Sequence, residues 1–390
     1  MPFVDSITHL GIDRSMRSPN SKTINKRVST ATNTMYALMP CGLHGENGLS
    51  PHASRKIITS YVLPRLIYGL ESLVLSKTEL LTLERAYKQL LRTLLTLREG
   101  TADEAVYFLI GLPPLEAELD IRILSIFGNI TRLCHDHPLR RIALRQISFP
   151  SAGNEGWFKM VLRVSDKYNL KDLLCASLIS PWSKLAWKSY IRKVVLNYWI
   201  YMLKANADCK SSLRFMITDD IQSFSVHHLW PRGGCASRPR VAASYRAKIL
   251  SGSYILQSNR ARFNQNQINH TCPLCHSALE DLPHFILTCP SLDNARTKHL
   301  PAIFNAVSAL GLSLPTNPEA RCVSILNMIN PKDCNLCHGG KNRKHSGIIG
   351  LVSINRKCMC TLLNERINIL CIDLHNCRSL VLSRKGKSGS

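Results

Sequence analysis

Three cysteines and one histidine between residues 272 and 289 have the residue types and the spacing of a metal site. Cys272 and Cys275 are separated by two residues, and His284 and Cys289 complete the pattern C-x2-C-x8-H-x4-C. Structural zinc sites hold the ion with four Cys or His ligands in a tetrahedron and favour thiolates. Because protein side chains would fill all four positions, no place remains for a reactive water. The pattern predicts a structural Zn²⁺ site with no catalytic role.

The chain must bring His284 and Cys289 together, although a regular helix does not place residues five apart on one face. Cys289 precedes Pro290, which disfavours helical dihedrals for the cysteine. A short helix over about 283–287 can therefore end there and fold Cys289 back toward the metal. His276 is an alternative ligand to His284, less well placed because it adjoins the turn. An apolar pad would support the site through Leu274, Leu279, Leu282, Phe285 and Ile286.

A second, more dispersed group of cysteines and histidines lies nearer the C-terminus. Its members are Cys334, Cys337, His338, His345, Cys358, Cys360, Cys371, His375 and Cys377. The string CNLCH at 334–338 also matches the motif for covalent haem attachment. No other feature supports haem, and the expected compartment keeps thiols reduced. Ordinary reduced thiols are therefore favoured over a second metal site.

The overall charge of the chain indicates a polyanionic partner. Its 390 residues include 50 Lys and Arg against 26 Asp and Glu, which gives a formal net charge of +24. Such an excess destabilises a compact chain through self-repulsion unless a polyanion offsets it. Nucleic acid, RNA or DNA, is the favoured partner. An anionic membrane surface and a merely basic soluble protein are the weaker alternatives, and no small-molecule substrate is indicated.

Hydropathy and the first residues bear on the compartment. With 45% hydrophobic residues, the chain should fold into two or three domains. The longest apolar run, VVLNYWIYML at 194–203, is too short for a membrane span of roughly 20 residues. The start MPFVDSITHL lacks the basic residues and apolar run of a secretory signal. We expect a protein of the nucleus or cytoplasm, not secreted, whose 15 cysteines are reduced.

Basic and aromatic residues are interleaved in one acid-free segment, since no Asp or Glu occurs from Ile221 through Leu279. Phosphate contact and base stacking require this combination. The predicted phosphate contacts are Arg246, Lys248, Arg260 and Arg262, and the predicted stacking residues are Tyr254 and Phe263. Core packing is the alternative for the aromatics, above all for Tyr254. On an upstream helix, Lys22, Lys26 and Arg27 are further predicted contacts, with a solvated face as the alternative.

The elements that position these residues are predicted to be helices almost throughout, because apolar residues recur at helical spacing. Helices are predicted over 22–38, about 115–132 and about 183–204. Another begins after Ser50–Pro51 and has a kink at Pro64. Two more follow the capping-box signatures Ser76 with Glu79 and Thr101 with Glu104. Only 3–12 is predicted to be extended, ending in a glycine turn. Residues 146–158 mark the favoured interior boundary. The tail 384–390 is expected to be disordered.

The order of these features resembles the C-terminal part of non-LTR (LINE-type) retrotransposon reverse transcriptases, over about residues 3–300. ITHLGID (7–13) is similar to the hairpin at the primer grip, although the family often has an aromatic where His9 stands. The Cys-Cys-His-Cys knuckle is the most specific match. The other similar segments are LIYGLESL (66–73), LLRTLL (90–95) and 105–130, which resemble the thumb and the helices after it, and 244–275, which resembles the approach to the knuckle.

The resemblance implies a domain order within a mainly α fold. The implied segments are 1–15, the end of the palm with a primer-grip-like hairpin; 16–145, a thumb-like helical bundle; 150–265, a second, basic helical region; 266–300, a CCHC zinc knuckle; and 301–390, a C-terminal helical region without a clear counterpart in the family. Residues 266–300 are called the CCHC knuckle.

The polymerase activity of the family is not expected to carry over. These enzymes hold two Mg²⁺ ions with palm carboxylates, and one carboxylate pair lies in an aromatic-x-Asp-Asp hairpin upstream of the grip. The only adjacent aspartates here are Asp219 and Asp220 in ITDD, with Ile217 where the aromatic belongs. We expect this pair to be a surface turn or helix cap, and we predict no catalytic residues.

The function that the resemblance implies is a nucleic-acid-binding, zinc-binding fragment of such a reverse transcriptase, as a truncated copy of the element would encode. One alternative is an RNA-directed DNA polymerase whose catalytic palm is missing from this gene model. Another is a zinc-dependent protein-interaction module. A truncated product with no cellular role is the remaining alternative.

Overall fold

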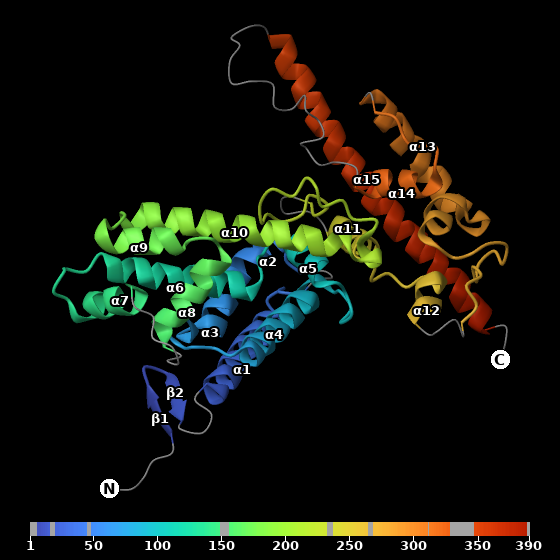
Figure 1. Cartoon of the computed structure of the whole chain (residues 1–390). Coiled ribbons are helices and arrows are strands. Elements are labelled where there is room, and N and C mark those ends of the chain that lie inside the picture. Colours follow the sequence, from blue (N-terminus) through green and yellow to red (C-terminus); the bar gives the residue numbers. More distant parts are fainter. Residues whose placement is uncertain are drawn as a thin grey trace.

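The computed structural model describes residues 6–15, 20–44, 48–148, 156–231, 237–263, 268–310, 312–327 and 347–387. Helices α1 to α15 and one short two-stranded sheet make up the regular structure of this part of the chain (Figure 1). The prediction of a mainly α fold is confirmed. Within the same ranges, no helix combines the length and the apolar character that crossing a bilayer requires.

The N-terminal sheet is an antiparallel hairpin of β1 (Ser6–His9) and β2 (Ile12–Ser15). Leu10 and Gly11 connect the strands with φ values of 49° and 76°. Two residues in the left-handed region are typical of the type I′ turn, whose twist matches that of the flanking strands. The predicted extended segment is therefore confirmed, and its glycine turn joins two strands instead of ending one.

The first group of helices follows the hairpin. It comprises α1 (Ser21–Leu38), α2 (Pro51–Ile57), α3 (Leu63–Ile67), α4 (Lys77–Leu95) and α5 (Asp103–Ile110), with a 3-10 turn at Leu70–Ser72. The predicted kink at Pro64 takes the form of a π-helical turn, Ile58–Val62, immediately before α3. A proline in the first turn of a helix leaves no hydrogen bond unmade, so the break lies before Pro64 and not at it.

One of the two predicted capping boxes is present. Ser76 accepts from the Glu79 backbone at 3.3 Å, and the Glu79 carboxylate accepts from the Ser76 backbone at 2.8 Å. The prediction for Thr101 is wrong, because α5 begins without a side-chain cap. The Glu104 carboxylate accepts instead from Lys210 Nζ at 2.6 Å, so a contact distant in sequence replaces the local one.

A second group of helices packs around its own apolar core. It comprises α6 (Leu115–Thr131), α7 (Pro138–Ser148), α8 (Trp157–Lys167), α9 (Lys171–Ile179) and α10 (Lys184–Asp208). Trp187 on α10 lies against Gly128 on α6 so closely that a Cβ there would stand 2.2 Å from the indole nitrogen. The Trp187 indole donates to the Leu124 carbonyl at 2.8 Å, which fixes the crossing of these two helices.

A buried carboxylate in this second core makes stability depend on pH. Asp120 accepts from the Tyr168 hydroxyl at 2.6 Å and from Lys167 Nζ at 3.1 Å. Burial raises the pKa of Asp120 to about 6 against the opposing effect of Lys167. Because this folded-state pKa lies above that of the unfolded chain, the protonated form favours folding. Asp120 therefore destabilises the fold above pH 6, and this penalty disappears as the pH falls toward 4.

We expect Asp120→Asn to remove this pH dependence. Between pH 7 and pH 4.5, the unfolding free energy of the unsubstituted chain should rise by about 2 kcal/mol relative to that of the variant. Urea unfolding of both proteins at the two pH values measures this difference, and the histidine contributions cancel in the comparison. Parallel pH curves for the two proteins would contradict the assignment.

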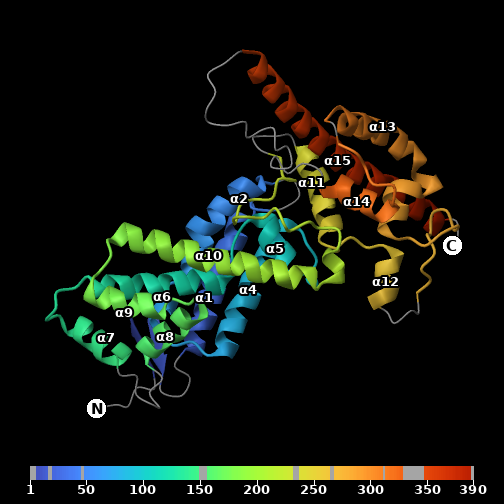
Figure 2. The ribbon, with the colours of Figure 1, turned by 45° about the horizontal axis from the view of Figure 1, so that its top comes forward.

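The C-terminal part gathers around one long helix. The preceding elements are a 3-10 turn at Ser211–Leu213, α11 (Ser237–Leu250), α12 (Gln257–Phe263), the π-helical turn η4 (His284–Thr288), the 3-10 turn η5 (Pro290–Leu292), α13 (Asp293–Ala309) and α14 (Pro318–Asn327). The long helix is α15 (Gly347–Lys387), which packs along α11 and α13 (Figures 1 and 2). The tail is thus helical as far as Lys387, so the prediction of disorder from residue 384 is wrong over its first four positions.

One apolar core joins the first helices to the C-terminal part. Leu274 and Phe285 of the CCHC knuckle belong to the same buried cluster as Ile24 of α1 and Leu374 of α15. The CCHC knuckle is therefore packed into a larger body. The domain boundaries inferred from the resemblance stay predictions.

Candidate metal centre

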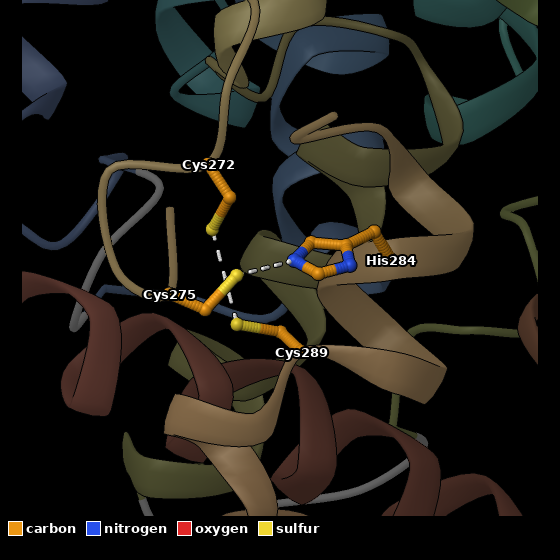
Figure 3. Close-up of side chains that lie close together, drawn as sticks. All are labelled: Cys272, Cys275, His284 and Cys289. Carbon is orange, nitrogen blue, oxygen red and sulfur yellow. Dashed lines mark hydrogen bonds between the residues drawn. The ribbon is translucent and has the colours of Figure 1, made fainter. Parts of the chain in front are cut away.

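The four predicted ligands converge (Figure 3). One candidate ligand atom from each of Cys272, Cys275, His284 and Cys289 lies within 4.8 Å of the other three. The Sγ atoms of Cys272 and Cys289 are 3.8 Å apart, and Cys275 Sγ lies 3.3 Å from His284 Nε2. Within the described ranges no other group of three or more His, Cys, Asp or Glu side chains has this geometry.

A tight hairpin presents the first pair of ligands. Thr271 and Leu279 form an antiparallel bridge, and the Cys272 backbone donates to the Ala278 carbonyl at 2.8 Å. His276 closes the turn with a φ of 56° and donates its backbone N–H to the Cys272 carbonyl at 3.0 Å. The hairpin thus directs Cys272 and Cys275 to the same side, and His276 is exposed at its tip, outside the ligand cluster. Of the two candidate histidines, His284 is the one in the cluster.

A π-helical turn brings the second pair of ligands together. The Cys289 backbone N–H donates to the His284 carbonyl at 2.8 Å, a bond between residues five apart. The wider turn of a π-helix suits this spacing, which an α-helix does not. The sequence predicted a short helix over about 283–287, and the structure has a helical turn there, of the π type. Cys289 itself has φ −63° and ψ 115°, the extended conformation expected before Pro290.

Further hydrogen bonds fix the orientation of the imidazole. His284 Nε2 faces Cys275, while Nδ1 lies 3.3 Å from the Thr288 hydroxyl one helical turn later. The His284 backbone N–H donates to Asp281 Oδ1 at 2.8 Å. Partners on the second ring nitrogen select the tautomer that leaves the other nitrogen available to a metal. Thr288 and Asp281 were not singled out from the sequence, because nothing in their spacing marks them.

The thiols differ in how readily they ionise. Burial raises the pKa of Cys289 to about 12 and also raises the pKa of Cys272. Burial opposes ionisation of Cys275 too, but hydrogen bonds from the Ser277 side chain and backbone prevail and lower its pKa to about 6. A metal binds thiolates and releases their protons. The three thiols therefore differ in how readily they ionise, and a bound metal ion would hold all three as thiolates.

A buried salt bridge connects the CCHC knuckle to the C-terminal helix. Both carboxylate oxygens of Glu280 accept from Arg378 on α15, at 2.7 and 3.0 Å. Glu280 also accepts from the backbone of Gln257, the first residue of α12, at 2.7 Å. The bidentate geometry is the strong form of this interaction. Glu280 was not predicted as a site residue. The sequence does carry a signal for it, because Glu280 is the first acidic residue after the acid-free segment.

Two predicted nucleic-acid contacts are wrong. Arg246 is fully buried and donates to the Leu326 carbonyl at 2.8 Å and to Asn368 Oδ1 at 3.2 Å. Tyr254 is also buried, with its ring 5.3 Å from that of Phe285, so the core-packing alternative holds. The long helix α15 covers this face of α11, and the local sequence does not reveal that cover.

The other predicted contacts differ in exposure. Lys22, Lys26 and Arg260 are exposed, and Lys26 Nζ lies 3.4 Å from Asp13. Arg27 is half-buried and donates to the Gly11 carbonyl at 2.7 Å. The remaining predicted contacts are Lys248, half-buried with its ammonium group 5.0 Å from the Tyr245 ring centroid, and Arg262 and Phe263, whose side chains lie outside the described part of the structure.

The adjacent aspartates lie in a turn, as predicted. Asp219 is exposed, and its carbonyl accepts from Lys204 Nζ at 2.6 Å. Of the second Cys/His group, 334–338 and His345 lie outside the described residues, as do the side chains of Cys358 and Cys360. The described members, Cys371, His375 and Cys377, do not form a cluster of ligand atoms.

Comparison of the chain with protein-family models, with curated proteins and with solved structures finds no match.

Proposed function

We propose that this chain is a zinc-stabilised nucleic-acid-binding protein, as its resemblance to the C-terminal part of non-LTR retrotransposon reverse transcriptases implies. The observation that carries the proposal is the convergence of Cys272, Cys275, His284 and Cys289. These four residues lie in the CCHC knuckle of a chain whose net charge of +24 favours a polyanionic partner.

The geometry supports zinc as the metal. For a Zn–S bond of roughly 2.3 Å, the sulfurs of a tetrahedral site stand about 3.8 Å apart. The two buried sulfurs, of Cys272 and Cys289, have this separation. Three thiols and one imidazole form a common ligand set of structural zinc sites. With four protein ligands the ion has no open position, so its role is to hold the knuckle folded.

The charge supports nucleic acid as the partner. The acid-free segment ends inside the knuckle, at Leu279, and Arg260 within this segment is exposed, as are Lys22 and Lys26 on α1. Cations on the surface bind phosphates with little dependence on base sequence and release counterions as they do so. A protein-interaction module would use the knuckle without this electrostatic contribution, so salt dependence separates the two functions.

We expect binding of single-stranded RNA or DNA to weaken steeply with salt. Four phosphate contacts would reduce the affinity on the order of 100-fold between about 50 and 200 mM salt. Fluorescence anisotropy of a labelled oligonucleotide across this range measures the slope, with zinc content determined on the same protein by elemental analysis. An affinity that does not change with salt would reject the proposal, and a partner profile of proteins alone would favour the interaction module.

A further inference from the structure

A pocket lies where the first helices meet the C-terminal part. Its volume is about 720 Å³, and its walls come from the α4–α5 turn, the 3-10 turn at Ser211–Leu213 and the connection from α11 to α12. These segments are distant in the sequence, and none of the four candidate metal ligands lines the pocket, although Leu282 of the CCHC knuckle does. The volume is in the range of pockets that take a small organic ligand.

The charged side chains of the pocket favour an anion. Among the described residues, four cations and one acid, Glu99, line it, so the lining itself carries an excess of three positive charges, although two of the cations are paired with acids outside the lining. The cations are Arg98, Lys210, Arg214 and Arg260. Lys210 and Arg214 are paired with Glu104 and Glu319 but keep 40% and 43% of their side chains exposed. A concave surface with one sign of charge concentrates the field on a bound ligand.

The hydroxyl groups of the pocket are a second, independent indication. Thr101 lines the pocket and is only 4% exposed, and its hydroxyl has no hydrogen-bond partner in the protein. A buried hydroxyl without a partner is unfavourable, and a ligand oxygen would satisfy it. Five serines line the same pocket, at Ser211, Ser212, Ser251, Ser253 and Ser258. Hydroxyls and guanidinium groups together are the donors that a phosphate group accepts from.

The walls of the pocket are held together. Gly252 has a φ of 67°, and a Cβ at this position would stand 2.5 Å from the Ser212 carbonyl oxygen. The backbone at the end of α11 therefore packs directly against the 3-10 turn. The hydroxyls of Ser251 and Ser253 lie 2.9 Å apart in the same turn. A preformed wall reduces the entropy that a ligand loses on binding.

Apolar side chains complete the lining. Phe215, Leu256 and Leu282 are buried in the pocket wall, and Ile255 is 40% exposed beside them. We propose that this pocket binds one unpaired nucleotide, with its phosphate at the cations and Thr101 and its base or sugar against the apolar wall. The inference rests on the proposed nucleic-acid binding and assigns one contact of that binding to this pocket. The nucleotide comes from a single strand or from a free mononucleotide, which share this chemistry.

The experiment compares two variants with a matched control. Arg98→Ala with Arg260→Ala removes two pocket cations, and Arg141→Ala with Arg145→Ala removes two exposed cations from α7. We expect the pocket variant to bind a single-stranded oligonucleotide about 100-fold more weakly and to lower the salt slope by about 2. The control variant should keep the slope of the unsubstituted chain. Thr101→Val removes a hydroxyl without changing charge and should weaken binding about fivefold with an unchanged slope.

The outcomes separate this proposal from the proposed function. If the unsubstituted chain binds the oligonucleotide and the pocket variants bind like the control, the pocket assignment is overturned and the function stands. If it binds no oligonucleotide but binds a labelled mononucleotide, and Thr101→Val binds that mononucleotide about fivefold more weakly, the pocket stands and its source is free nucleotide. If neither probe binds, both proposals fail. Zinc content and circular dichroism of each variant confirm that it is folded.

Discussion

Replacing Cys272 and Cys275 together with serine is expected to abolish metal binding. The unsubstituted chain should contain about one zinc ion, and the double variant close to none, because two hydroxyls do not replace two thiolate ligands. Elemental analysis of the purified proteins measures the content. The matched control is Cys134→Ser with Cys175→Ser, since both cysteines are exposed and lie outside the cluster. A double variant that keeps its zinc would refute the assignment of ligands.

Loss of the ion should also destabilise the C-terminal part of the chain. Structural zinc contributes on the order of 10 kcal/mol or more to the folding of such modules, as much as the whole stability of many domains. The knuckle positions Glu280 for its salt bridge with Arg378. Loss of the metal should therefore also weaken the packing of α15 against the knuckle. Hydrogen exchange should show faster exchange in α11, the knuckle and α15. The protection of α6 and α10, which pack around the separate second core, should change little.

A chelator provides the corresponding test without substitution. Treating the unsubstituted chain with a strong zinc chelator should reproduce the hydrogen-exchange pattern of the serine variant. Returning zinc should restore the protection in the unsubstituted chain but not in the variant. If the chelated protein keeps the protection of the metal-bound protein, the metal does not support the fold.

The sequence predicted those features that short segments determine by themselves. The four metal ligands lie within 18 consecutive positions, and their types restrict the chemistry to a few metals. The capping box at Ser76 and the extended Cys289 before Pro290 likewise depend on neighbouring residues alone. The π-helical turn at His284 was not predicted, because propensity does not distinguish it from a short α-helix. Only the metal spacing gave a reason to suspect an unusual turn.

Features that depend on distant partners were not predictable. The Glu104 carboxylate had the spacing of a cap but binds Lys210, which is 106 positions away in the sequence. The pocket has the same origin, since its walls come from three separate segments. A charged side chain on a helix is ordinarily expected at the surface. Because α15 packs over α11, Arg246 is buried instead of exposed. The effect of this burial on the stability of the chain can be measured.

Arg246→Ala is expected to destabilise the chain strongly and to affect nucleic-acid binding only through folding. The guanidinium group donates to the Leu326 carbonyl through both Nε and Nη2, at 2.8 and 2.5 Å, and holds Asn368 of α15 at 3.2 Å. Burial lowers the pKa of Arg246 to about 10, so it remains charged at neutral pH. Truncation would leave these acceptors buried without a donor, at a cost of about 3–5 kcal/mol.

Two further variants on α11 test this role. Arg246→Lys keeps the charge but not the fork of donors, so it should still lose about 2 kcal/mol. Arg238→Ala is the control, because Arg238 is 73% exposed and its partner Asp373 lies 3.9 Å away, a pair worth less than about 0.5 kcal/mol. Urea unfolding and oligonucleotide binding are measured on the same samples. If Arg246→Ala kept full stability and lost affinity, Arg246 would be a phosphate contact after all, and the packing of α15 on α11 would be refuted.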